Sequence, residues 1–362
     1  MSTDPAFRFL VLSHGRQGTF SLYLALNRAG PIHVPPFEHS DLALANGDAE
    51  ALFRPRGPFA WQAHPPLALD GRVPGLIHHN CARAEQLPGH TAATLASILR
   101  TDAPLILFAR DPVENIVSVY NTYLEMFFAG RLLAGAAPSD LYARDEPMTL
   151  AEAARAYRYL GRYGEQLAAH AELGGERLIG DFTDLDPERL PRTLTAIAAL
   201  LGLDGLSPAA ADGPGNPGTD LLLQRAFGFR ERPLLDGFPL ELGFFPRASD
   251  PLCRGSLEIP LPGDAFHCLP PELGVFVSAR SWYAMPPAYR EAIAGARDPD
   301  RLVMRSFDRY LAFVEQVRAA AQPLRRSPGD AATREPVRRE VVDDAAAFAR
   351  AWPDACRSWR AV

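Results

Sequence analysis

The sequence predicts an α/β fold: a doubly wound, mostly parallel sheet flanked by helices, with a C-terminal extension. Apolar runs of strand length alternate with segments of helical length over roughly the first 205 residues, which is typical of a parallel sheet with helical crossovers. Two of these runs end in an arginine-containing turn that opens a helix. Ligands of such sheets bind beyond the carboxyl ends of the strands, so we expect the functional site at that edge.

The strands are predicted from short apolar runs bounded by turn residues or helix starts. Each is too short for a helix and rich in Leu, Ile, Val or Phe. In chain order the expected strands are Arg8–Ser13, Pro31–Val34, Leu76–His79, Pro104–Ala109 and Glu176–Gly180.

Helices are predicted between these strands. The helix after Gly18 carries Leu22, Leu24, Ala25 and Leu26. Thr149, with Glu152 three residues later, forms a capping-box pattern. After the helix that follows Gly18, the expected helices are Leu42–Phe53, Thr91–Leu99, Val113–Leu133 and Thr149–Leu173.

Residues beyond 205 carry weaker patterns. Asp204–Thr219 is dense in Gly, Pro, Ala and Asp and is predicted to be a linker or surface excursion. Short strands and loops are expected over residues 220–285. Helices are expected at Pro287–Ala296, Leu302–Ala321 and Val341–Trp352, with a mobile stretch at Gln322–Pro336.

Composition favours a soluble, cytoplasmic protein that does not bind nucleic acid. The net charge is −6 and the pI about 5.9, which argues against a general nucleic-acid binder. We expect no signal peptide and no membrane span, because no apolar run is long enough. The cysteines are not at metal-binding or redox spacing, so all are expected to be reduced and structural: Cys81, Cys253, Cys268 and Cys356.

All 37 basic residues are arginine, because the sequence contains no lysine. Any phosphate or sulfate site must therefore use guanidinium groups, whose planar fork can contact two oxygens at once.

The first arginine segment, residues 9–22, reads FLVLSHGRQGTFSL. Arg16 follows the apolar run, Gly18 allows a close backbone approach to an anion, and Thr19 opens a helix. The free N–H groups at a helix N-terminus attract anions. We therefore expect an anion site at Arg16, Gln17, Gly18, Thr19, Phe20 and Ser21.

The second arginine segment, residues 105–118, reads LILFARDPVENIVS. Asp111, Pro112 and Glu114 have the pattern of a helix entrance, with an acceptor cap, a first-turn proline and an acid three residues after the cap. Arg110 lies just before the cap and Ser118 two turns into the helix. Both can face one dianion beside the first turns.

Together the two segments resemble the sulfotransferase family, which uses 3′-phosphoadenosine 5′-phosphosulfate as sulfuryl donor. The first is similar to the family's [K/R]-x-G-T-T loop, except that Phe20 replaces the second threonine. The second is similar to R-[DN]-P-x-x-x-x-x-S, with the spacing from Arg110 to Ser118 intact. A third stretch, residues 178–203, resembles the strand, "EDL" turn and "FLGL" helix that follow in the family.

The resemblance implies a P-loop-like fold and a metal-free transfer of a sulfuryl group to a hydroxyl or amine of a carbohydrate, lipid or small metabolite. It implies that Arg16 and the first loop bind the 5′-phosphosulfate and that Arg110 and Ser118 bind the 3′-phosphate. The expected organisation is a donor-binding core at 1–205, a region completing the fold and acceptor site at 206–340, and a C-terminal helix and tail at 341–362. Homo-oligomer formation is left open.

The general base is the open question of this reading. Glu38 lies in a segment similar to one that carries a glutamate in carbohydrate-type members, and His79 lies where small-molecule members carry a histidine. We place Glu38 ahead of His79, with His39 and His78 behind. Adjacent strand residues point to opposite faces, so at most one of His78 and His79 faces the site.

Two other functions compete with this prediction. A nucleotide or small-molecule kinase would need the lysine of a G-x-x-x-x-G-K-[ST] loop, which this chain lacks. A catalytically inactive, nucleotide-binding relative is the second rival, because Phe20 removes a hydroxyl that the family uses and the base is not identified.

Overall fold

The computed structural model describes residues 7–13, 18–35, 72–78, 89–133, 147–171, 175–206, 286–288 and 300–360, and the backbone of short strands between residues 230 and 278. Of residues 20, 24, 89–92, 169 and 300–307, only the backbone is described. The predicted helix Leu42–Phe53 and most of the predicted linker at 204–219 lie outside these residues. So do Cys81, Cys253 and Cys268.

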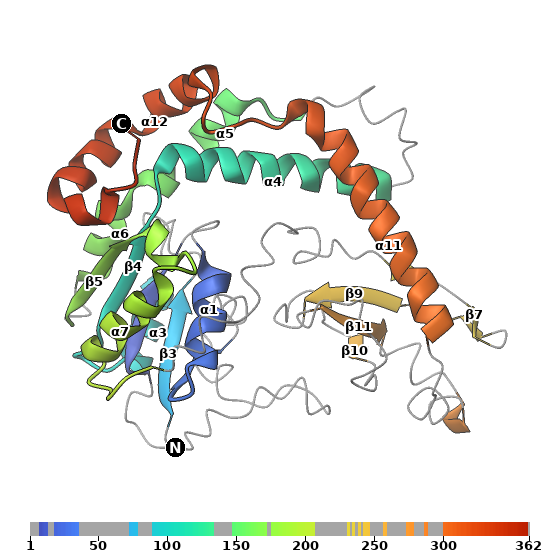
Figure 1. Ribbon diagram of the computed structural model, residues 1–362, viewed down its shortest axis with the longest axis horizontal. Coiled ribbons are helices and arrows are strands. Elements are labelled where there is room, and N and C mark those ends of the chain that lie inside the picture. Colours follow the sequence, from blue (N-terminus) through green and yellow to red (C-terminus); the bar gives the residue numbers. More distant parts are fainter. Residues whose placement is uncertain are drawn as a thin grey trace.

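A five-stranded, all-parallel sheet forms the centre of the N-terminal half (Figure 1). The strand order is β2-β3-β1-β4-β5. The predicted α/β class is therefore confirmed, and each predicted strand is present with shifted ends. The strands are β1 (Phe9–Leu12), β2 (Ile32–His33), β3 (Val73–His78), β4 (Leu105–Ala109) and β5 (Arg177–Asp181).

Helices cover both faces of this sheet, because successive strand residues point to opposite sides. On one face, Val11 and Ile106 pack with Leu26 and Leu194 of the helices α1 and α7. On the other, Leu12 and Leu107 belong to a cluster with side chains of α3, α6 and α12. The bounds are α1 (Thr19–Arg28), α3 (Gly89–Ile98), α6 (Tyr163–Ala169), α7 (Leu190–Leu200) and α12 (Ala331–Ala351).

Strands β1 and β4 are neighbours in the sheet although β2 and β3 lie between them in the sequence. Their register pairs Leu10 with Leu105 and Leu12 with Leu107. The chain leaves β1 toward β2 and leaves β4 toward β5, so the two exits diverge. The carboxyl ends of β1 and β4, from which the two arginine segments continue, consequently lie side by side at one edge of the sheet.

The predicted helix Thr149–Leu173 is wrong as a single element. The capping box at Thr149 and Glu152 is present, but the chain breaks into α5 (Leu150–Ala156), a 3₁₀ turn η4 (Arg158–Gly161) and α6. Gly161 lies so close to Pro112 that a Cβ would be 3.2 Å from the Pro112 side chain. The break lets the chain pass this contact and places Tyr163 in the core, where it is 0% exposed.

Gln322–Pro336, predicted to be mobile, is ordered. It forms η8 (Gln322–Leu324), a turn, and the start of α12 at Ala331, ten residues before the predicted Val341. The long helix α4 (Pro112–Leu133) holds this stretch. The Asn121 amide of α4 donates to the Arg326 carbonyl and accepts from the Arg326 N–H, both at 2.9 Å. Glu125 of α4 pairs with Arg325.

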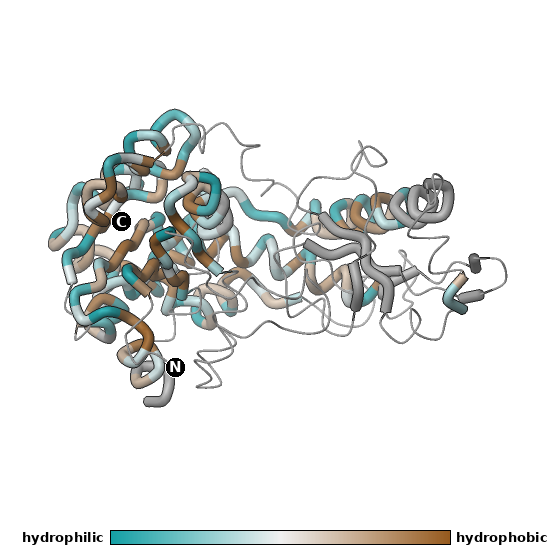
Figure 2. The backbone as a smooth tube through the Cα atoms, turned by 90° about the horizontal axis from the view of Figure 1, so that it is seen from below, coloured by the Kyte–Doolittle hydropathy of each residue, from teal (hydrophilic) through white to brown (hydrophobic). Residues whose placement is uncertain are grey.

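The C-terminal segment then packs on the sheet. Trp359 stacks on Phe348 at 5.9 Å, and both rings contact Tyr163, at 5.9 and 5.0 Å between centroids. Cys356, which ends η9 (Pro353–Cys356), is free and buried as predicted. Burial raises the pKa of its thiol to about 12. Figure 2 shows brown and teal alternating along the outer helices of this body, as expected where one face of each helix is buried.

A second group of strands lies apart from the parallel sheet (Figure 1). Four strands pair antiparallel in the order β10-β11-β9-β6, beside a two-stranded ribbon of β7 and β8. Helix α11 (Asp300–Ala321) packs on α4 and reaches β9. None of the described helices is long and apolar enough to cross a membrane. The strands are β6 (Arg230–Glu231), β7 (Leu234–Leu235), β8 (Phe238–Pro239), β9 (Leu242–Pro246), β10 (Ser256–Glu258) and β11 (Leu273–Ser278).

The ion pair between Arg334 of α12 and Asp111 predicts a large stability effect. The Arg334 Nη2 to Asp111 Oδ2 distance is 3.0 Å, and the side chains are 14% and 2% exposed. Removing the cation leaves a buried carboxylate, so Arg334→Met should lower the free energy of unfolding by about 3 kcal/mol. The matched control is Arg339→Met on the same helix, whose pair with Glu335 is exposed and should contribute less than about 1 kcal/mol. Urea unfolding of both variants measures this, and equal losses would contradict it.

Candidate functional site

In the first arginine segment, a strand precedes a helix. Strand β1 ends at Leu12, and α1 begins at Thr19. The hydroxyls of Ser13 and Thr19 hydrogen-bond to each other across the intervening loop, and both residues are buried. Two of the predicted site residues, Arg16 and Gln17, lie in that loop and outside the described residues.

Gly18 is required at its position for two reasons. It caps α1 with a left-handed backbone, φ 71° and ψ 17°, which a side chain disfavours. A Cβ there would also lie 2.9 Å from Leu185 and 3.1 Å from Phe182. The backbone therefore approaches its surroundings more closely than any other residue type would allow.

The N-terminus of α1 has the polarity of an anion site. No side chain caps it, and its first turn contains no acidic residue. The partial positive charge of the helix start is thus not compensated by a carboxylate of its own. Predicted residues Thr19, Phe20 and Ser21 form this first turn; Thr19 is buried, Ser21 is half-buried, and the side chain of Phe20 is outside the described part.

Arg110 leaves β4 in a backbone position that Tyr163 holds. The Tyr163 hydroxyl accepts from the Arg110 N–H at 3.0 Å and donates to the Arg110 carbonyl at 2.7 Å. The predicted helix entrance follows: Asp111 Oδ1 accepts from the Val113 N–H at 2.8 Å. The backbone N–H and carbonyl of Arg110 are therefore both hydrogen-bonded to the buried Tyr163 side chain.

The Arg110 side chain is 18% exposed and lies across an aromatic ring. Its guanidinium carbon is 4.7 Å from the ring centre of Phe182, a cation–π contact. Glu114 lies 4.0 Å from Arg110 Nε. Burial lowers the pKa of Arg110, while Glu114, Tyr163 and Asp111 act in the opposite direction. The guanidinium nevertheless stays charged at neutral pH, as arginine does in proteins.

Phe182 joins the two arginine segments. It is the first residue of the 3₁₀ turn η6 (Phe182–Leu185), directly after β5. Its ring lies close to Gly18 and also contacts the Arg110 guanidinium. The third stretch thus supplies the contact through which the first two meet.

Helix α4 carries two further polar side chains, Asn115 and Ser118, in its first two turns. Ser118, predicted for the site, is half-buried, and its carbonyl accepts from the Thr122 hydroxyl. Asn115 stands one helical turn earlier on the same side of the helix and is 0% exposed. Neither amide atom of Asn115 has a hydrogen-bond partner in the part of the chain that the structure describes. Such an arrangement costs about 1–3 kcal/mol.

Of the candidate bases, only His78 lies within the described residues. It shares the sheet face of Leu76, which packs on α3 and α6. Its ring lies edge-on to that of His170, 5.8 Å between centroids, and is 5% exposed. Burial also lowers the pKa of His170. His78 is therefore a core residue, whereas Glu38, His39 and His79 lie outside the described residues.

Sequence reasoning missed Phe182, Tyr163, Asn115 and Arg334 as residues of this region. Only Asn115 carried a local signal, as an amide near the start of a helix that also holds Val113, Ile116 and Val117. The other three act through contacts between distant segments. Among the described residues no group of three His, Cys, Asp or Glu side chains could hold a metal ion.

Comparison with known proteins gives no match: no family model fits the chain, and no curated protein or solved structure is similar to it.

The close packing at Gly18 predicts that alanine there destabilises the protein more than alanine at Gly30. Both glycines have positive φ, 71° and 88°, so both alanines bear backbone strain of about 1–2 kcal/mol. Only at Gly18 would the new Cβ crowd other atoms, since nothing lies within 4 Å at Gly30. Thermal unfolding of Gly18→Ala and Gly30→Ala should differ by a further ~1 kcal/mol or more. Equal losses would show that the space around Gly18 is not needed.

Proposed function

We propose that this protein is a sulfotransferase that uses 3′-phosphoadenosine 5′-phosphosulfate. The observation that carries the proposal is the convergence of the two arginine segments on Phe182. The Gly18 turn and Arg110 follow neighbouring strands, and both lie against the ring of Phe182. Two anion-binding elements at one edge suit a ligand with two separate anionic groups.

The proposed donor site lies where the exits of β1 and β4 diverge. In a doubly wound sheet this divergence is where ligands bind, and we take the sheet to be of that type. The N-terminus of α1, Thr19 and Arg16 would hold the 5′-phosphosulfate. Arg110 and Ser118 would hold the 3′-phosphate, with Phe182 and Tyr163 keeping Arg110 in place.

The donor supplies an activated sulfuryl group: the acceptor oxygen bonds to sulfur, the sulfur–oxygen bond to the phosphate breaks, and the acceptor proton passes to a base. Arg16 would stabilise the charge that grows on the leaving phosphate. Glu38 or His79 would take the proton. We do not assign this role to His78, whose ring is buried beside that of His170. The acceptor is a hydroxyl or amine of a carbohydrate, lipid or small metabolite.

The unpartnered amide of Asn115 supports a ligand on this side of α4. A buried amide without hydrogen bonds lowers stability, and a bound phosphate or ribose would satisfy it. We include Asn115 with Ser118 in the proposed 3′-phosphate half of the site.

A nucleotide-binding protein without catalysis is the second candidate. The observation favouring it is Phe20, which stands in the first turn of α1 where the resembled loop has a hydroxyl. Nucleotide binding without turnover across a broad panel of acceptors would support this alternative.

The 3′-phosphate assignment predicts nucleotide selectivity. Adenosine 3′,5′-bisphosphate should bind at least about tenfold more tightly than 5′-AMP, because a charge-assisted contact contributes on the order of 1.5–3 kcal/mol. Arg110→Ala should abolish the preference, whereas Arg158→Ala at an exposed position should retain it. Calorimetric titration of both nucleotides against the unmodified protein and the two variants measures all six affinities. Equal binding of the two nucleotides to the unmodified protein would remove the assignment.

Asn115 and Asn121 of α4 offer a matched pair. Asn115→Leu removes an unsatisfied amide, so stability should rise by about 1 kcal/mol while affinity for adenosine 3′,5′-bisphosphate falls several-fold. Asn121→Leu removes an amide that is paired with the Arg326 backbone, so stability should fall by about 1–2 kcal/mol with affinity unchanged. An Asn115→Leu protein with full affinity would remove Asn115 from the site.

The base is tested by Glu38→Gln and His79→Ala in a sulfuryl-transfer assay with a hydroxyl acceptor near neutral pH. Glu38→Gln should abolish transfer and leave nucleotide affinity nearly intact, because the amide keeps the shape but cannot take the proton. His79→Ala should retain activity. The reverse result would assign the base to His79, and activity in both would exclude both.

A further inference from the structure

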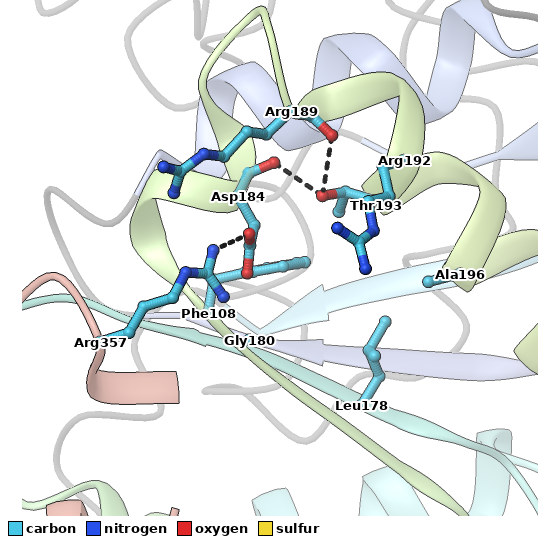
Figure 3. A pocket seen from close by; sticks show the side chains of 9 residues that line it. All are labelled: Phe108, Leu178, Gly180, Asp184, Arg189, Arg192, Thr193, Ala196 and Arg357. Atoms are coloured by element: carbon cyan, nitrogen blue, oxygen red, sulfur yellow. Dashed lines mark hydrogen bonds and ion pairs between the residues drawn. The ribbon is translucent and has the colours of Figure 1, made fainter. Parts of the chain in front are cut away.

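A cavity lies beside η6, over the edge of the sheet (Figure 3). Its volume is about 550 Å³, within the range of small-molecule sites. Strands β4 and β5 form its floor with Phe108, Leu178 and Gly180, and α7 forms one wall. Arg357 of the C-terminal segment closes one end.

A hydrogen bond and close packing define the shape of the cavity. The Thr193 hydroxyl of α7 donates to the Asp184 carbonyl at 2.7 Å, which fixes α7 against η6. At the floor, a Cβ on Gly180 would lie 2.8 Å from the Phe108 ring and 3.2 Å from Asp184 Oδ2. Glycine therefore allows the ring and the carboxylate to lie together beneath the opening.

The charge balance of the walls is positive. Asp184 is paired with Arg357, and this hydrogen bond raises the pKa of Arg357. Arg189 donates to the neutral Thr183 hydroxyl at 2.7 Å. Within the described residues, neither Arg189 nor Arg192 makes an ion pair. Two guanidinium charges thus remain uncompensated around the cavity.

Figure 3 shows the guanidinium of Arg192 turned toward the floor, above the apolar side chains. A ligand that meets both features carries an anionic group and a flat apolar body. Guanidinium forks bind carboxylate and phosphate through paired hydrogen bonds, while Phe108, Leu178 and Ala196 offer apolar contact.

We propose that this cavity binds a small aromatic anion, a carboxylate or phosphate ester, with Arg192 holding the anionic group. The site is separate from the proposed donor site, since Gly18, Thr19 and Arg110 are not among its lining residues. Within η6, Phe182 contacts Arg110 and Asp184 lines the cavity. The inference does not depend on the proposed function.

The test is calorimetric titration of the full chain with phenyl phosphate, benzoate, inorganic phosphate and neutral benzamide. Phenyl phosphate or benzoate should bind, and inorganic phosphate and benzamide should bind at least tenfold more weakly. Arg192→Gln should lower the affinity for the bound probe at least tenfold. Arg158→Gln, at another exposed arginine, should leave it unchanged. Because Arg192 and Arg158 are both exposed, both variants should fold, and thermal unfolding verifies this.

A second variant and a competition experiment complete the test. Ala196→Trp should place an indole in the cavity and abolish binding. Saturating adenosine 3′,5′-bisphosphate should not displace the probe. Binding that survives Arg192→Gln or Ala196→Trp, displacement by the nucleotide, equal binding of benzamide, or no binding of either aromatic anion would overturn the proposal.

Discussion

The parallel pairing of β1 with β4 is the constraint on which the rest of the candidate site depends. It places Leu12, the last residue of β1, beside Leu107 of β4. Gly18 and Arg110, which follow these strands, therefore lie at the same edge of the sheet. Phe182, reached through β5 on the other side of β4, can then lie against both. A different neighbour for β1 would separate the two arginine segments by at least one strand width, about 4.8 Å.

Residues 334–359 contact the residues that hold this edge of the sheet in place. Arg334 pairs with Asp111, the residue after Arg110. Trp359 and Phe348 pack on Tyr163, whose hydroxyl holds the Arg110 backbone. The Ser358 N–H donates to Asp181, the last residue of β5, at 2.9 Å. Two of the carboxylates that begin the turns after β4 and β5 are thus satisfied by residues more than 170 positions away.

Structural features that depend on residues close together in the chain could be predicted from the sequence. Strand runs, the Thr149 capping box and the Asp111 cap all follow from short patterns, and all are present. The break at Gly161 and the order of residues 322–336 were not predictable, because each depends on a contact with α4 that no local pattern encodes. Phe182 was missed for the same reason: its partners, Gly18 and Arg110, are distant in the chain.

These long-range partners have a consequence for biosynthesis. All five strands of the parallel sheet are complete by residue 181, but the partners of Asp111 and Asp181 are Arg334 and Ser358, separated from them by 223 and 177 residues. During vectorial synthesis the sheet emerges from the ribosome long before the residues that close its carboxyl edge. The site region can therefore become native only after Arg334 and Ser358 have left the ribosome, and until then its carboxylates and the aromatic face of Tyr163 are open to chaperones.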